Sequence, residues 1–200
     1  MNPLEKYYRQ PAIYIKLPSK GKYYTKEVYT PTETGEIPVL PMTAKDELAF
    51  KTPDAMINGQ ATVDVIKSCV PNLKDPWKMV NYDTDVVLLA IRIATYGENM
   101  DIGFRVPVVN DEQSHTLILP ELLEQLGRIE IEDETTTSKG FKIQIQPLNY
   151  KTLTKIQIAR FEQQKMYGTI DSSSMTEEEK QSAFGKSFAT LNMVNFSLLV

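Results

Sequence analysis

The segment 86–96 constrains the fold of this chain more than any other, because it is apolar on nearly every side. Only Arg92 and Thr95 interrupt the apolar run. An Asp-Thr-Asp run at 83–85 offers an N-cap and an acidic first turn, and Gly97 is placed to close a helix in the left-handed conformation. A helix that is apolar all round must be covered by other elements, so we expect this one at the centre of the fold. Arg92 would then need a partner, and a carboxylate of the same domain is favoured over a ligand.

Short strands are predicted in the first forty residues. Residues 13–17 and 37–40 are short apolar runs, and a connection rich in Thr and Pro joins them over residues 25–36. Pro18 fixes its own φ and Gly21 can adopt a positive φ, which predicts a turn after the first strand. Lysines and tyrosines are interleaved around this turn, a pattern that could bind nucleic acid. A solvent-exposed, charged strand face is favoured over a nucleic-acid surface, because edge strands commonly carry lysine.

Helical patterns lie between these strands and the central helix. Thr43 is followed by Asp46 at the third position, which is typical of a helix N-terminus. Further on, a stripe at three- and four-residue spacing predicts a helix that Pro71 ends; its members are Thr62, Val65, Ile66, Cys69 and Val70. Because Cys69 belongs to this stripe, a buried thiol is favoured over a nucleophile.

Two hairpins are predicted after the central helix. In the first, residues 101–109 alternate as in a strand and pair with 115–119 across a polar turn. His115 there is expected at a strand edge rather than as a metal ligand. A short helix at 121–126 leads to the second hairpin.

The second hairpin is predicted to pair residues 129–131 with 141–145. An acidic, hydroxyl-rich turn over 132–140 would join its strands. Three consecutive carboxylates in this turn could in principle hold a cation. They lack the alternating Asp-x-Asp-x-Asp spacing of a calcium-binding loop, so a solvated loop is favoured over a calcium site.

The last part of the chain is predicted to be a helical hairpin. Apolar residues from Leu153 to Tyr167 mark its first helix, which we expect to end at Gly168. Thr176 and Glu179 have the spacing of a capping box for the second helix. The fold class is therefore α+β, with an α+β core domain over 1–146 and a helical hairpin over 147–200 as a partner-binding element.

The predicted partner-binding residues lie in the second helix of that hairpin. Large apolar side chains share a face of the helix and continue into its apolar end; they are Phe184, Phe188, Leu191, Phe196, Leu198 and Leu199. Phe, Met and Tyr are enriched where protein partners pack, although the same residues could fill the domain's own core. The apolar end indicates either that these residues pack on a partner or that the natural chain continues.

Composition narrows the function classes. A net charge of −4 argues against nonspecific nucleic-acid binding, which needs a basic face. With one cysteine and one histidine the chain lacks the ligands of a typical zinc site, and we expect no metal or other cofactor. No leader peptide or membrane-spanning run is apparent, so we expect no membrane partner. No phosphate loop, nucleophile elbow or His-Glu-x-x-His motif is present, so we expect no enzymatic activity.

Four phrases make this sequence similar to a known family. They are LPSKGKYY at 17–24, LPMTAKDE at 40–47, SCV followed by DP within 68–76, and LLAIRIATYG at 88–97. In this order they resemble the baseplate hub assembly proteins of T-even-like contractile-tailed bacteriophages. Some relatives carry paired cysteines in the first hairpin, and this chain has none there, so a metal site is not carried over.

The resemblance implies a role in tail assembly rather than a reaction. It implies a chaperone-like factor that binds other phage baseplate hub or tail proteins in the host cytoplasm. A permanent structural subunit of the hub or tail tip, located in the virion baseplate, is the alternative. Self-association of the chain stays open.

Overall fold

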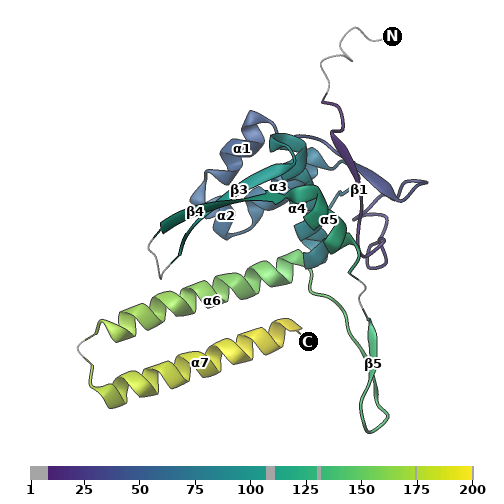
Figure 1. Cartoon of the computed structure of the whole chain (residues 1–200). Helices are drawn as coiled ribbons and strands as arrows, with labels where there is room; N and C mark the ends of the chain where they lie inside the picture. Colours follow the sequence, from purple (N-terminus) through teal and green to yellow (C-terminus); the bar gives the residue numbers. More distant parts are fainter. Residues whose placement is uncertain (1–8, 107–110, 130–131, 174, 200) are drawn as a thin grey trace, which may run out of the picture.

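The computed structural model describes residues 9–106, 111–129, 132–173 and 175–199, with some side chains inside helices and strands left out. It contains helices and small antiparallel strand pairs, which confirms the α+β class. Most elements of the N-terminal half form one core, and three pairs of elements project from it (Figure 1).

Both predicted N-terminal strands are confirmed. Strand β1 (Ile13–Lys16) pairs antiparallel with β2 (Glu36–Val39), with Ile15 opposite Ile37. Because alternate residues of a strand point to one face, this register places Ile15, Ile37 and Val39 together in the core. The turn after β1 is also confirmed, since the Lys20 N–H donates to the Leu17 carbonyl oxygen (2.9 Å) and Gly21 has φ +78°.

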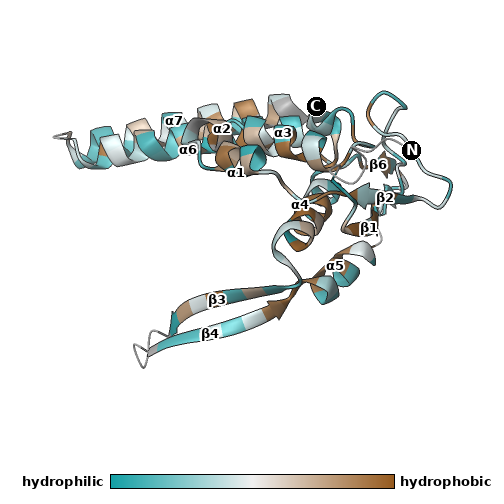
Figure 2. Ribbon diagram, turned by 90° about the horizontal axis from the view of Figure 1, so that it is seen from above, coloured by the Kyte–Doolittle hydropathy of each residue, from teal (hydrophilic) through white to brown (hydrophobic). Residues whose placement is uncertain are grey.

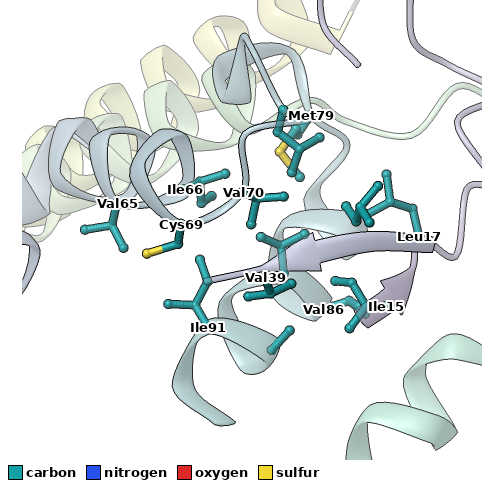
Figure 3. Close-up of a cluster of buried hydrophobic side chains, with 14 of the residues drawn as sticks. Ile15, Leu17, Val39, Val65, Ile66, Cys69, Val70, Met79, Val86 and Ile91 are labelled. Atoms are coloured by element: carbon teal, nitrogen blue, oxygen red, sulfur yellow. The ribbon is translucent and has the colours of Figure 1, made fainter. Parts of the chain in front are cut away.

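Short helices follow the strand pair and pack beside it. They are α1 (Ala44–Phe50), α2 (Pro53–Ile57), α3 (Gln60–Cys69) and the 3-10 helix η2 (Pro76–Lys78). The Thr43 hydroxyl and the Asp46 carboxylate cap α1 reciprocally. Helix α3 ends before Pro71 and buries the predicted stripe; Figure 3 shows side chains of α3, β1, β2 and α4 meeting in one cluster.

The central helix α4 (Asn81–Tyr96) begins five residues earlier than the start of the apolar run. Val87, Ala90 and Ile91 are almost completely buried, which confirms its central place. The predicted N-cap at 83–85 is wrong, because Val80 is the cap residue and Asp83 lies inside the first turn. Gly97 does end the helix, but φ +89° and ψ −176° lie outside the left-handed helical region.

Arg92 does not have the predicted carboxylate partner among the described residues. Its guanidinium stacks 4.7 Å from the centre of the Tyr96 ring, and one buried guanidinium nitrogen has no hydrogen-bond partner there. The face of an aromatic ring attracts a cation, and this attraction gives the guanidinium part of the electrostatic stabilisation that an ion pair would give. The contact between Arg92 and Tyr96, which lies one helical turn further along α4, therefore takes the place of the expected salt bridge.

The first projection is the hairpin of β3 (Asn99–Val106) and β4 (Asp111–Ile118), followed by α5 (Leu119–Gly127). The hairpin and the helix confirm the predictions, except that β4 begins at Asp111, within the predicted turn; residues 107–110, which include the end of the predicted first strand, lie outside the described part of the chain. Figure 2 shows the hairpin extending away from the core, with α5 turning back beside α4.

The second projection pairs β5 (Glu134–Thr136) with β6 (Lys142–Gln144), so the predicted first strand is wrong at Ile129. Residues 130–131 lie outside the described part of the chain. A tight turn explains the shift, because the Gly140 N–H donates to the Thr137 carbonyl oxygen (2.9 Å) and draws the β-branched threonines into the ladder.

The third projection is the helical hairpin of α6 (Tyr150–Asp171) and α7 (Glu177–Leu199). The prediction that Gly168 ends the first helix is wrong, since α6 continues to Asp171; one glycine costs a helix only about 1 kcal/mol. The Thr176–Glu179 capping box is confirmed by hydrogen bonds in both directions (2.9 and 3.4 Å). The first turn of α6 is bonded to the core, since the Tyr150 N–H donates to the Met79 carbonyl oxygen (2.6 Å).

Candidate protein-interaction site

The β3–β4 ribbon carries an apolar face that the described residues do not cover. Met100, Ile102 and Phe104 alternate along β3 and are 39%, 37% and 48% exposed. Residues directly opposite in an antiparallel pair share a face, and Leu117 lies opposite Met100. We call these four residues the ribbon face; they form an apolar strip along β3 that Leu117 widens at one end, and Gln113 and His115 lie beside the strip on β4.

The other face of the ribbon is polar. Arg105 forms an exposed ion pair with Glu112 (3.1 Å), and the Thr116 hydroxyl donates to Asp101 (2.6 Å). His115 lies opposite Ile102, so it shares the side of the ribbon face rather than the polar side, and it is exposed in β4, as expected of a strand residue. An isolated two-stranded ribbon has little stability in water, so an amphipathic one is suited to gain stability by packing its apolar face on another protein.

The β5–β6 hairpin also exposes large apolar side chains. Phe141, Ile143 and Ile145 are 68%, 45% and 48% exposed. At the base of the hairpin, Asp133 accepts a hydrogen bond from the Tyr23 hydroxyl and pairs with Lys22. The lysine- and tyrosine-rich turn therefore holds the second projection on the core.

The predicted partner-binding residues of α7 fall into two groups in the structure: some pack within the helical hairpin and others are exposed. Phe184 packs edge-on against Tyr167 of α6 (5.0 Å between ring centres), and Leu191 is half-buried beside α6. Phe188 and Phe196 are 59% and 70% exposed. The side chains of Leu198 and Leu199 lie outside the described residues. Phe188 and Phe196 are thus open to a partner, whereas Phe184 already serves the helical hairpin.

The ribbon face and Phe161 of α6 (41% exposed) are sites that sequence reasoning missed. The signal was present, because Met100, Ile102 and Phe104 alternate with charged residues and a glycine. Alternation predicts a strand with one apolar face, but it does not predict whether other elements of the same chain pack on that face. The coverage depends on how far the ribbon projects.

The turn at 17–24 has a structural role. Asp83 is completely buried and accepts hydrogen bonds from the Ser19 N–H (3.0 Å), the Ser19 hydroxyl and the Tyr24 hydroxyl (2.5 Å). Burial raises the pKa of Asp83, and these hydrogen bonds partly oppose the rise. The turn is thereby fixed to the first turn of α4.

Cys69 is buried in the core, as predicted. Burial raises the pKa of its thiol to about 11, and the charge of Asp46 adds to the rise. A thiol in this state is unreactive near neutral pH, which supports a packing role. Within the described part of the chain, His, Cys, Asp and Glu do not gather in groups of three that could hold a metal ion. None of the helices described there has the length and apolarity to span a bilayer.

Comparison with known proteins gives one family. The family model described as T4 bacteriophage base plate protein matches residues 11–185. The match takes in the core, the first two projections, all of α6 and the first part of α7. No curated protein and no solved structure matches the chain.

Proposed function

This chain belongs to the T4 bacteriophage base plate protein family, and from that premise we propose that it is an assembly factor for the baseplate hub. In this proposal it acts by binding other hub and tail proteins in the host cytoplasm and catalyses no reaction. A factor that binds one conformation of a partner more tightly shifts the partner toward that conformation.

The observation that carries the proposal is the uncovered apolar surface of the three projections. Large apolar residues gathered on exposed surfaces mark contacts with other proteins. Here they lie on elements that project from the core (Figure 1), so partners can approach the ribbon face, the β5–β6 hairpin and Phe188 of α7 without disturbing the core.

A permanent structural subunit is the second candidate. The same uncovered surface favours it, because interfaces of permanent complexes are more apolar than those of transient ones. Mass spectrometry of purified virions separates the two candidates. An assembly factor is absent from finished particles, whereas a subunit is present at a fixed copy number.

Binding itself is tested by co-expressing the tagged chain with the other tail-hub gene products and identifying what co-purifies. We expect Phe104→Asp and Phe188→Asp each to reduce the recovered partner at least tenfold, because each places a charge in an apolar contact. Phe188 is a cleaner target than Phe184, whose replacement would also remove the contact with Tyr167.

Matched controls place the same charge elsewhere on the same elements. Ser114→Asp lies on the polar face of the ribbon, and Gln181→Asp lies at an exposed position of α7. Both should leave co-purification unchanged. Recovery of the partner by both phenylalanine variants at the wild-type level would refute the proposed binding surfaces.

A further inference from the structure

A groove runs between the two helices of the α6–α7 hairpin. It has a volume of about 500 Å³, and its lining residues recur at three- and four-residue spacing on both helices. Ala159 and Met166 of α6 and Ala183 and Val194 of α7 are among its lining residues. Two small alanines let another helix approach closely, and Met166 is 51% exposed. We call this surface the hairpin groove.

The walls of the hairpin groove carry opposite charges. Glu162 lies on the α6 wall and Lys186 on the α7 wall. The only ion pair that the described residues show for α7 joins Lys180 and Glu177, so neither groove charge is paired there.

Both charges lie at a similar level along the hairpin. The contact between Tyr167 and Phe184 sets the level of the two helices. With a rise of about 1.5 Å per residue, Glu162 and Lys186 both lie on the side of that contact away from the hairpin turn, within roughly one helical turn of each other.

We propose that the hairpin groove is the contact surface of a homodimer, in which the α6–α7 hairpins of two copies form an antiparallel four-helix bundle. A two-fold axis parallel to the helices places α6 of one copy over α7 of the other. Glu162 then faces Lys186 of the second copy, and the same pair forms again on the other side of the axis. The surface is complementary to itself, as a two-fold interface requires.

The charges also disfavour the other two-fold arrangement when its axis passes near Glu162. An axis perpendicular to the helices would place α6 over α6 and would bring Glu162 toward its own copy. Like charges facing each other weaken an interface. Helices of about 22 residues are roughly 33 Å long, so the face of such a hairpin buries on the order of 600 Å² per copy, near the lower limit for a specific interface.

Phe188 and Phe196 are not among the residues that line the groove. They stay exposed in the dimer and available to hub proteins. Dimer formation is therefore independent of the proposed assembly function, and each can fail without the other.

The first test is the molar mass of the full chain in solution, measured by light scattering over a range of concentrations. The wild-type chain should move from monomer to dimer, and Met166→Glu should raise the dissociation constant at least tenfold. Phe196→Ser is the matched control, since it removes an apolar side chain outside the groove and should leave the constant unchanged. A wild-type chain that stays monomeric into the millimolar range overturns the proposal.

The second test uses charge reversal in trans. Glu162→Lys and Lys186→Glu should each weaken the homodimer about three- to tenfold, because each leaves two like-charge contacts. A mixture of the two variants forms a heterodimer in which both contacts join opposite charges, so it should associate about as tightly as wild type. If the mixture associates no better than either variant alone, the α6-over-α7 arrangement is wrong.

A helix from a hub protein is the competing occupant of the groove. If Met166→Glu abolishes co-purification of a hub protein while the wild-type chain alone is monomeric, the groove binds that partner and the homodimer is refuted. If the chain is monomeric and still binds hub proteins through Phe188, only this inference fails.

Discussion

At the scale of single residues, one buried carboxyl joins two distant parts of the sequence. Asp83 of α4 accepts hydrogen bonds from Ser19 and Tyr24, and the Tyr24 hydroxyl in turn accepts one from the Val80 N–H (3.1 Å). Buried donors that lose their acceptor cost far more than exposed ones. The phrase at 17–24 thus carries side chains that fix the turn to the central helix.

Replacing this acceptor tests its role. Asp83→Ala should lower the free energy of unfolding by about 2–4 kcal/mol, because the Ser19 N–H and two hydroxyls lose their partner in the core. Urea denaturation measures the loss. Asp85→Ala, at an exposed position of the same helix, should stay within about 0.5 kcal/mol of wild type. Equal effects of the two substitutions would contradict the assignment.

The raised pKa of Asp83 predicts a pH dependence. The folded state holds the proton more tightly than the unfolded state, in which the pKa is near 3.8. Stability from this group is therefore fully present below pH 3.8 and is lost as pH rises through the folded pKa. Asp83→Asn does not titrate, so the free energy of unfolding of wild type relative to this variant should fall as pH rises from 4 toward 7. A difference that does not vary with pH would contradict the raised pKa.

At the scale of elements, sequence patterns predicted most types but misplaced several ends. Helix α4 starts before its apolar run, because Asn81 and Tyr82 join the helix without adding to the apolar pattern. Strand β5 contains threonines that the sequence predicts in a turn, and Gly168 does not interrupt α6. A tertiary hydrogen bond from Asn81 to Leu148 accompanies the early start of α4, a local turn shifts β5, and the cost of one glycine is too small to end α6.

At Gly97, the residue that ends α4, the backbone conformation requires a glycine. With φ +89° and ψ −176°, it lies in a region that only glycine occupies readily. Among the described residues, no atom beyond the adjacent residues lies within 4 Å of an added Cβ, so the penalty for Gly97→Ala is a backbone penalty of about 1–3 kcal/mol in thermal or urea unfolding. Gly103→Ala, in β3 and equally uncrowded, has no positive φ and should be nearly neutral. An unchanged stability of Gly97→Ala would contradict the positive φ at the end of α4.

At the scale of the whole molecule, a buried core supports three projections with little core of their own. The sequence predicted the core, because buried stripes and caps are local signals, and it predicted both hairpins and the helical pair. It did not predict that the projections would leave their apolar faces uncovered. Of the predicted partner residues, Phe188 and Phe196 are exposed, whereas Phe184 and Leu191 contribute to packing between α6 and α7.

Hydrogen–deuterium exchange of the chain, alone and in complex with the hub protein that co-purifies with it, tests the central claim most directly. We predict slower exchange in β3–β4 and in the α6–α7 hairpin on complex formation, with α3 and α4 unchanged because they are already buried. Slower exchange confined to the core elements, with β3–β4 and α6–α7 unchanged, would contradict the account.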